Sequence, residues 1–349
     1  MVTMSSSVQI IAEMAWSHDG SVELAEKIVR DAADAGANAI SVHFTDMPNY
    51  MVRHYGSGPG RVSAGKDVKP IYDYLVEINL TQDHWRQVAK VAAEVKLDLV
   101  VMPNDPASLD FAETLTPAAY VLSAASFEEW GFIRAVGALG RPVYLRVGGA
   151  TLGEIEKAID LLRAVGNEAI TLLYGHQNYP TKIEDTNLAF LTCLKATFGL
   201  PVGIADHVDA DDSFALVAPL MAIPLGISCI EKHLTHDRAK RGEDFESALN
   251  GSELKQLVDL VRKAEGALGR TNAVGLDASS AAYRRNSRKR LIAACDIKAG
   301  DILTEAMVGS KRSDEGEPGA HRDLVIGRRA LSDFAKDDGI TLDRLGARE

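Results

Sequence analysis

The sequence is short of cysteine, since its 349 residues contain only Cys193, Cys229 and Cys295. These three lie far apart and are odd in number, which excludes a disulfide framework and a Cys-x-x-Cys metal or redox motif. A chain that relies so little on cysteine is expected to work in the reducing cytoplasm. The first residues show no basic segment followed by an apolar core, so they predict no signal peptide.

Long apolar runs and an excess of basic residues are also missing. No apolar run approaches the roughly 20 residues that span a bilayer, so we expect no membrane-spanning segment. Lys and Arg together number 38 against 49 Asp and Glu, which gives a formal net charge of -11. Because nucleic acids and anionic membranes are polyanions, this charge argues against both as partners. A local basic pocket for a small acidic substrate is compatible with it.

Short runs rich in β-branched residues recur along the first three quarters of the chain and predict buried strands. Longer amphipathic stretches between them predict helices, and this alternation favours a parallel sheet covered by helices. The predicted helices are 21–35, 81–96, 127–139, 151–165, 186–197, 213–221 and 252–268. Eight such units in about 270 residues match the size of a (β/α)8 TIM barrel. A doubly wound open sheet is the alternative, but no dinucleotide-binding loop follows the first run. The predicted strands are 8–12, 39–44, 97–102, 119–123, 143–147, 170–174, 202–205 and 229–234.

The connection over residues 45–80 is too long for an ordinary loop between a strand and a helix. It follows the second predicted strand, at the end of the barrel where active sites lie. Two interpretations stay open: a lid that covers the substrate, and an ordered insertion without a moving part.

The last quarter of the chain differs in character from the barrel predicted over residues 1–269. Residues 270–287 are polar and lack a clear period, so they predict a linker. Residues 288–349 predict a small β-rich domain, with a turn at Ala299-Gly300 and short β-type runs over 288–294, 296–301, 302–308 and 324–330. About 60 residues are marginal for independent stability, so we expect this domain to dock on another surface.

Polar residues at the ends of the predicted strands are the candidates for chemistry, because TIM barrels carry their active sites there. Ser41 and His43 are two residues apart on one strand and therefore share a face. His207 and His233 end the last two strands, with carboxylates nearby. This pattern is typical of a divalent-metal site, although hydrogen-bonded barrel histidines would look the same. Further candidates are Glu13, Ser123, Arg146, His176, Gln177, Tyr179, Asp206 and Glu231.

At these positions the chain resembles the N-acetylneuraminate (sialic acid) synthase family. Each matching segment is weak by itself, but the ordered series is specific and covers nearly the whole chain. Residues 296–301 look like part of the family's antifreeze-like domain. The other matches are Ile11-Ala12-Glu13, Ser17-His18-Asp19-Gly20, residues 35–40, Tyr179-Pro180-Thr181, Asp206-His207, residues 231–235 and Gly242-Glu243-Asp244.

The resemblance implies an enzyme that condenses phosphoenolpyruvate with an acylated amino sugar and releases phosphate. It also implies a divalent metal, Mn or Mg, which His207 and His233 hold and which polarises the sugar aldehyde. Glu13 matches an active-site glutamate, and Tyr179 and Asp244 match positions that touch the sugar or its neighbours. A homodimer is implied too, in which the antifreeze-like domain of one subunit reaches the barrel of the other.

The departures from the family lie on the phosphoenolpyruvate side. On strand 2 the family has Lys-Phe-Gln, where this chain has Ser41-Val42-His43. On strand 4 the family has Lys-Ile-Pro-Ser-Gly-Glu, which corresponds to residues 121–126 here. Both lysines that bind phosphoenolpyruvate in the family are therefore missing. Arg146 is the new cation, and we expect it to bind an acidic co-substrate. His43 and His176 are also absent from the family's pattern. They could be acid–base groups, or they could fill the space left by the family's lost polar side chains. The other predicted substrate contacts are Ser41, Ser123, Gln177 and Asp206.

Three functions follow from this pattern. The first is metal-assisted carbon–carbon bond formation between a sugar-like aldehyde and an acidic three-carbon co-substrate, with phosphoenolpyruvate implied by resemblance. The second is a lyase, aldolase or isomerase that keeps the metal site and abandons phosphoenolpyruvate. The third is a non-catalytic binding subunit, which a degenerate anion site would suit.

Overall fold

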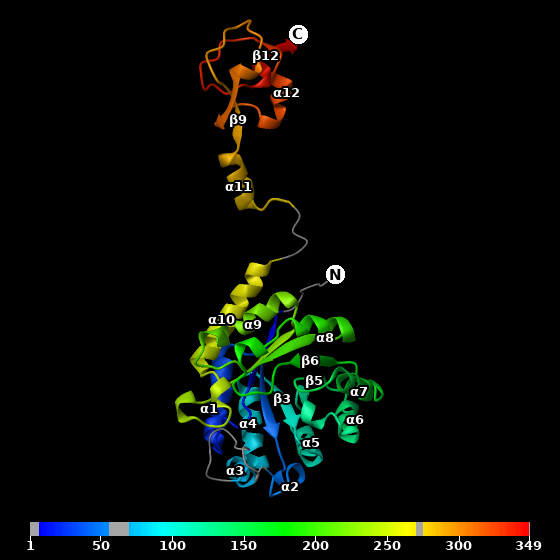
Figure 1. The fold of residues 1–349 in the computed structure, drawn as a ribbon. Helices are drawn as coiled ribbons and strands as arrows, with labels where there is room; N and C mark the ends of the chain where they lie inside the picture. Colours follow the sequence, from blue (N-terminus) through cyan, green and yellow to red (C-terminus); the bar gives the residue numbers. More distant parts are fainter. Residues whose placement is uncertain (1–6, 56–69, 270–274, 349) are drawn as a thin grey trace. The chain divides into compact units, whose positions relative to one another are not determined.

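The computed structural model describes residues 7–55, 70–269 and 275–348, in two compact units that span Met1–Gly269 and Arg270–Glu349. The first unit is a closed barrel of eight parallel strands in chain order (Figure 1). This confirms the TIM-barrel prediction and excludes the doubly wound alternative. Each strand begins and ends within one residue of its prediction: Gln9–Glu13 (β1), Ala39–Phe44 (β2), Asp98–Pro103 (β3), Ala119–Ser123 (β4), Val143–Arg146 (β5), Ile170–Tyr174 (β6), Val202–Asp206 (β7) and Cys229–His233 (β8).

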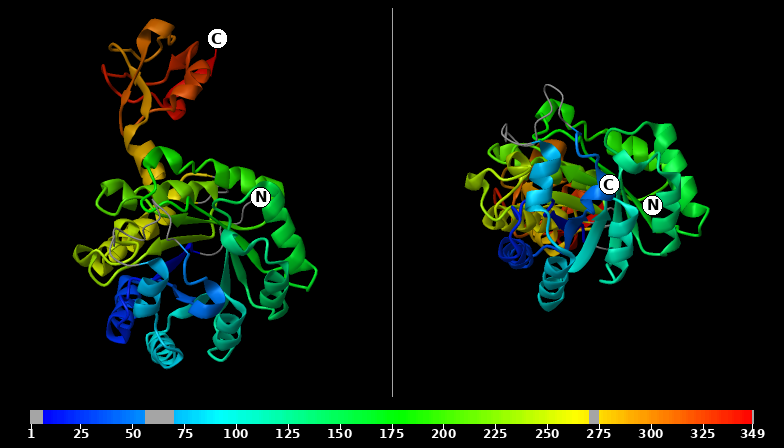
Figure 2. Two further views of the ribbon diagram at one scale, coloured as in Figure 1. Left: turned by 60° about the horizontal axis from the view of Figure 1, so that its bottom comes forward. Right: turned by 90° about the horizontal axis from the view of Figure 1, so that it is seen from below.

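Helices surround the barrel on its outside, as the turned views in Figure 2 show. Sequence signals at their ends explain several boundaries: the Ser21 side chain accepts a hydrogen bond from the backbone of Leu24, and Gly36 ends the same helix with φ 86°. Thr151 and Glu154 form a complete capping box. The helices are Val22–Ala35 (α1), Gln82–Glu94 (α4), Pro106–Glu113 (α5), Trp130–Ala138 (α6), Leu152–Arg163 (α7), Phe190–Phe198 (α8), Ala218–Ala222 (α9) and Gly251–Leu268 (α10).

Two helical segments differ from the sequence prediction. Helix α5 was not predicted, because it is short; Asp105 caps it and Pro106 begins it. Residues 213–221 were expected to form one helix, but a 3-10 turn at Ser213–Leu216 precedes α9, which has Pro219 in its first turn. Proline is tolerated there and not in a helix interior, so the chain restarts its helix at that point.

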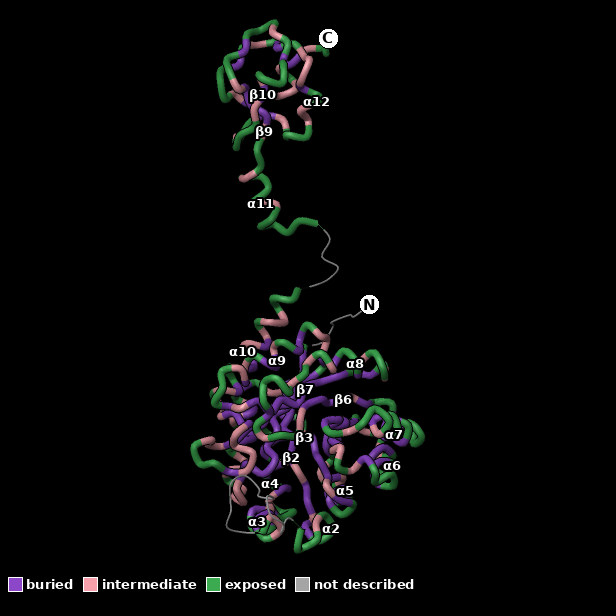
Figure 3. Tube along the Cα trace, viewed as in Figure 1, coloured by how far each residue is buried: buried purple, intermediate pink, exposed green. Residues whose placement is uncertain are grey.

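The barrel is buried on both sides of its strands, which appear in the colour of buried residues in Figure 3. Outward side chains pack against the helices in the main core, and inward side chains form a second apolar cluster inside the barrel. The alternation follows from the two-residue period of a strand. The inward cluster consists of Ile11, Ala39, Val100, Met102, Ala119, Val121, Leu173, Ala205 and Cys229.

The long connection after β2 contains two short helices, Met47–Tyr50 (α2) and Ile71–Ile78 (α3). Their buried side chains pack with Ala15 and Trp16, which follow β1. Both described ends of this connection are therefore attached to the barrel. The middle of this connection, residues 56–69, lies outside the described residues, so the choice between a lid and an ordered insertion stays open.

The second unit is β-rich and has its own core, as predicted. Strand β9 (Lys289–Ala293) pairs antiparallel with β10 (Val308–Arg312), and β11 (Arg328–Ala330) pairs with β12 (Leu345–Arg348). The strand expected over 302–308 was wrong, because Glu305–Met307 forms a 3-10 turn and β10 begins only at Val308. The strand expected over 324–330 is shorter than predicted, since Arg322–Val325 forms a helix (α12). The core residues are Leu291, Ala293, Ile297, Leu303, Val308, Val325, Ala330, Phe334, Ile340 and Leu345.

The segment predicted as a linker contains a helix, Ala278–Ser287 (α11), whose first turn is capped by the Asp277 side chain. The helix was missed because it has no apolar stripe, and none of its residues is buried. Within the described ranges, no helix is both long enough and apolar enough to cross a membrane.

Candidate functional site

Polar side chains gather inside the barrel at the carboxyl ends of its strands. Ile11, Ala39 and Cys229 belong to the inward cluster, so residues two and four further along the same strands also point inward. Strand register brings these residues level, because Glu13 pairs with Ser41 on one side and with His233 on the other. The inward polar side chains at the mouth are Glu13, Ser41, His43, Ser123, Arg146, His207, Glu231 and His233.

Arg146 lies between two glutamates. Its Nη2 donates to Glu13 Oε2 at 2.6 Å and lies 2.8 Å from Glu231 Oε1. All three residues are buried, with the Arg146 side chain 5% exposed. Burial lowers the pKa of the guanidinium, but Glu231 and Glu13 outweigh it and raise this pKa above its ordinary value. The arginine is therefore charged, and two carboxylates already share that charge.

The two glutamates respond differently to this environment. Burial raises the pKa of Glu13, but the charges of Arg146 and His43 outweigh burial and hold this pKa well below its ordinary range. Burial raises the pKa of Glu231 to about 7, since Arg146 offsets only part of it and Glu13 adds to it. Glu13 is thus the permanently ionised member of the pair.

Glu13 also holds His43. The Nε2 atom of His43 lies 3.1 Å from Glu13 Oε1, and the backbone N–H of Ala15 donates to the same oxygen at 2.9 Å. A carboxylate so close to one ring nitrogen favours this orientation of the imidazole. The predicted catalytic pair of Glu13 and His43 is therefore brought together by the fold.

His207 and His233 lie side by side, with ring centroids 5.1 Å apart. Burial lowers the pKa of His207 to about 3, and burial followed by the neighbouring His207 lowers the pKa of His233. The Nδ1–H of His207 donates to the backbone carbonyl of His176 at 2.6 Å, so its Nε2 carries a lone pair. Both imidazoles are therefore neutral, the form that binds metals.

These two histidines fit a divalent metal. His207 Nε2 and both ring nitrogens of His233 are buried and have no hydrogen-bond partner among the described residues. The carbonyl that fixes the His207 tautomer is the kind of support that metal-binding histidines receive. No group of three or more His, Cys, Asp or Glu side chains in the described part of the chain is arranged for a metal, so further ligands would be substrate or water.

An aromatic ring and a carboxylate border the histidine pair. The Tyr179 ring centroid lies 4.6 Å from that of His207 and 5.4 Å from that of His233, and its hydroxyl donates to Gln177 Oε1 at 3.0 Å. Asp244 Oδ2 lies 3.8 Å from His233 Nδ1, and burial raises the pKa of Asp244 to about 7. Tyr179, Gln177 and Asp244 therefore lie next to the histidines, where contacts to a sugar were expected.

Three predicted site residues already have partners within the protein. Arg146 was expected to bind a substrate anion, but Glu13 and Glu231 already use its charge. Asp206 faces away from the mouth, because its carboxylate accepts from the buried Lys232 ammonium at 2.6 Å. His176 contacts His207 through its backbone carbonyl and not through its imidazole ring.

Changing Asp206 to Asn should lower the free energy of unfolding of the barrel by about 3–5 kcal/mol, because the buried Lys232 ammonium then lacks its counter-charge. Metal affinity should stay unchanged, since the pair faces the helices. Urea unfolding and Mn titration of the same variant check both expectations. If the variant binds metal more weakly but unfolds at the same free energy, Asp206 belongs to the metal site after all.

Sequence reasoning left two residues out of the site. Glu231 was noted at a strand end but given no role, since its partner comes from a distant strand. His18 is completely buried; the backbone N–H of Gly20 donates to its Nδ1 at 3.2 Å, and burial followed by His43 lowers its pKa to about 3. The signal that could have indicated His18 was the segment Ser17-His18-Asp19-Gly20, which matches the family.

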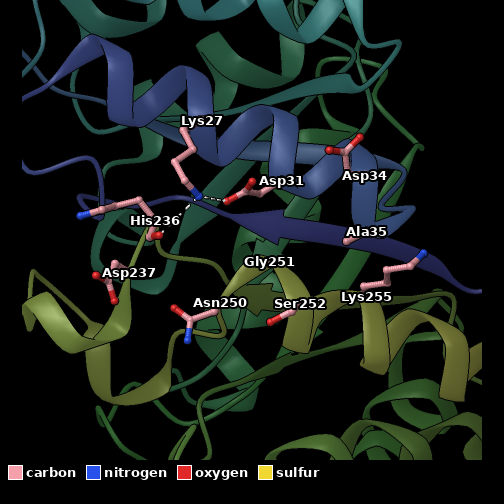
Figure 4. A pocket seen from close by; sticks show the side chains of 10 residues that line it. All are labelled: Lys27, Asp31, Asp34, Ala35, His236, Asp237, Asn250, Gly251, Ser252 and Lys255. Carbon is pink, nitrogen blue, oxygen red and sulfur yellow. Dashed lines mark hydrogen bonds and ion pairs between the residues drawn. The ribbon is translucent and has the colours of Figure 1, made fainter.

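A groove outside the barrel, with a volume of about 500 Å³, lies between α1 and the start of α10 (Figure 4). Lys27 pairs there with Asp31 at 2.5 Å, and the first turn of α10 is already capped by Asn250 and Glu253. None of the mouth residues described above lines it. The chemistry-bearing side chains are therefore those of the barrel mouth.

Comparison with known proteins finds a family model for each of the two units. A family model described as the NeuB family matches residues 28–273. The chain belongs to the NeuB family. A second model, described as the SAF domain, matches residues 288–346. The recognition of the sialic acid synthase family is thus confirmed, the chain is a synthase of that type, and its antifreeze-like domain is a SAF domain.

Individual relatives match this NeuB-family chain over most of its length. Pseudaminic acid synthase of Campylobacter jejuni is 32% identical over 95% of each chain, and N,N'-diacetyllegionaminic acid synthase of the same species is 27% identical over 94% of this chain and 97% of its own. Among solved structures, a putative spore coat polysaccharide biosynthesis protein E from Chromobacterium violaceum superimposes with a TM-score of 0.74 over 98% of this chain and 100% of its own, at 19% identity. The last likeness concerns the fold alone.

Proposed function

We propose that this chain joins a three-carbon acid to the aldehyde carbon of a sugar-like substrate, with a divalent metal on His207 and His233. The observation that carries the proposal is the buried pair of neutral imidazoles with unpartnered ring nitrogens. A metal at these nitrogens supplies polarisation of the aldehyde carbonyl. The remaining work belongs to the protein's own side chains.

Those side chains divide into two groups. Tyr179, Gln177 and Asp244 border the histidines and offer hydrogen bonds to the hydroxyl groups of a sugar. Glu13 and His43 form an acid–base pair beside the reacting carbon. The similarity to pseudaminic and N,N'-diacetyllegionaminic acid synthases supports a sugar acid as the product class. Phosphoenolpyruvate is the three-carbon acid that the family suggests; a homodimer and a cytoplasmic location belong to the same proposal.

A second candidate is a carbon–carbon lyase or aldolase that does not use phosphoenolpyruvate. The observation in its favour is the charge of Arg146, which Glu13 and Glu231 already balance. In addition, none of the inward side chains at the described mouth is a lysine.

The test is incubation of the manganese-loaded protein with phosphoenolpyruvate and a panel of 2-acetamido sugars, with released phosphate and new sugar acid measured. Turnover that is lost in His207→Ala supports the proposal, and His84→Gln on the outer helix α4 serves as the matched control. Sugar acid formed without phosphate release favours the second candidate. Failure to bind Mn or Mg would overturn both enzymatic functions.

A further inference from the structure

We infer that Tyr74 on α3 is a positioning residue for the sugar end of the barrel mouth, where it holds Asp244 in place through the carboxylate of Glu243. The inference rests on the proposed function in one respect, because Asp244 is given there the contact to the sugar. It assigns a task in the site to α3, the helix that ends the long connection after β2.

Asp244 sits on a backbone that needs support from outside its own segment. Its φ of 58° lies in the left-handed region, which is uncommon for residues other than glycine and persists where the surrounding structure holds it. Its carboxylate lies 3.8 Å from His233 Nδ1. The conformation of residues 242–248 therefore decides whether this carboxylate faces the histidine pair.

The loop after β1 provides the first support. The Ser17 hydroxyl donates to the backbone carbonyl of Glu243 at 3.4 Å. The Asp19 carboxylate lies so close to the backbone of Gly242 that a Cβ at this glycine would be 2.6 Å from Asp19 Oδ1. Two side chains of one loop thus contact the two residues that precede Asp244.

Helix α3 provides the second support. It packs closely on the loop after β1, since a Cβ on Gly20 would lie 3.1 Å from the Cα of Ile78. One turn earlier on this helix, the Tyr74 side chain is 6% exposed, and its hydroxyl donates a hydrogen bond to the Glu243 carboxylate. Hydrogen bonds to a charged acceptor are stronger than those between neutral groups. Tyr74 therefore ties α3 to the residue next to Asp244.

The charges around the Tyr74 hydroxyl explain why its loss would move Asp244. Burial raises the pKa of Tyr74, and the carboxylates of Glu243, Asp19 and Asp244 raise it further. The hydroxyl therefore keeps its proton and serves these carboxylates as a donor. Without it, three neighbouring carboxylates repel each other with one donor fewer, and a displacement of residues 242–248 relieves that repulsion.

The experiment is amide hydrogen exchange of the full-length protein, measured by mass spectrometry in Tyr74→Phe, which removes the hydroxyl and keeps the ring. The reporter is the peptide over residues 242–248, where the backbone N–H groups of Ser247 and Ala248 are hydrogen-bonded within the segment. We expect these amides to exchange about 10-fold faster or more, as loss of a hydrogen bond to a charged group predicts. Peptides of the eight barrel strands should exchange as in the original protein.

The matched control is Tyr72→Phe, the same chemical change on the same helix. The Tyr72 ring lies beside Arg53, with the guanidinium carbon 5.9 Å from its centroid, so exchange over residues 242–248 should not change. A second variant tests the route through Glu243. Once Glu243→Leu has removed the acceptor, adding Tyr74→Phe should change the exchange little, because the two side chains act as one unit.

The kinetic readout uses the phosphate-release assay with the 2-acetamido sugar that is turned over. In Tyr74→Phe the KM for the sugar should rise about 10-fold, with kcat and the KM for phosphoenolpyruvate within about 2-fold of the original protein, the pattern of a lost binding contact. Mn affinity should stay unchanged, because both imidazoles are intact. A general loosening of the barrel would lower kcat and Mn affinity as well.

The outcomes separate this inference from the function on which it rests. Unchanged exchange over residues 242–248 in Tyr74→Phe overturns the inference, and so does exchange that rises equally in the barrel strands. Product formed with an unchanged KM for the sugar overturns it too. Faster exchange confined to residues 242–248, with no product from any sugar, supports the positioning of Asp244 while the proposed function fails.

Discussion

Replacement of Arg146 with methionine should destabilise the barrel by about 3–5 kcal/mol, the usual cost of removing one partner from a buried ion cluster. Glu13 and Glu231 would then face each other without a counter-charge in the barrel interior. The three tryptophans, Trp16, Trp85 and Trp130, all lie in the barrel unit. Tryptophan fluorescence during urea unfolding therefore reports the stability of this unit separately from that of the SAF domain.

A second variant makes the Arg146 prediction specific. Glu231→Gln in the methionine background removes one of the two uncompensated carboxylates and should restore part of the lost stability. In the original protein the same change should cost less, because Glu13 still balances Arg146. If Glu231→Gln changes the stability equally in the original protein and in the Arg146→Met variant, the two charges are not coupled. The effect of Arg146→Met would then come from lost packing alone.

Changing His207 or His233 to alanine should weaken Mn binding by more than about 100-fold, since even supporting residues around a metal cost 10–100-fold when lost. Each histidine is buried and contributes ring nitrogens that nothing else in the described chain uses. Manganese titration monitored by electron paramagnetic resonance measures the affinity directly. Catalytic turnover should fall with it.

The matched control for the metal prediction is His84→Gln, which removes an imidazole from the outer helix α4. Fluorescence unfolding should show that the alanine variants remain folded, because their rings lie at the mouth and not in the main core. Retained tight Mn binding in both alanine variants would place the metal elsewhere or remove it from the protein.

The architecture could be predicted from the sequence because each strand carries its own signal. Runs of β-branched residues bounded by polar turns marked all eight strands to within one residue. Helices α5 and α11 escaped, the first because it is short and the second because it has no apolar face. In both cases the periodic pattern on which the prediction depends is absent.

The side chains at the barrel mouth could be predicted one by one from the sequence, but their contacts could not. Strand ends and motif matches pointed to Glu13, His207 and His233, and two-residue spacing placed His43 correctly. The partners of Arg146 could not be read in this way, because Glu13 and Glu231 come from distant parts of the chain. The pairing of Asp206 with Lys232 depends likewise on which face of the strand each side chain takes.

The Arg146 cluster also restricts the order in which this mouth can change. If Arg146 is replaced first, two buried carboxylates lose their counter-charge, whereas a new lysine at position 41 would supply one before the arginine is lost. The order of the two substitutions therefore matters, because Arg146 is more easily lost once a lysine at position 41 has supplied a second counter-charge.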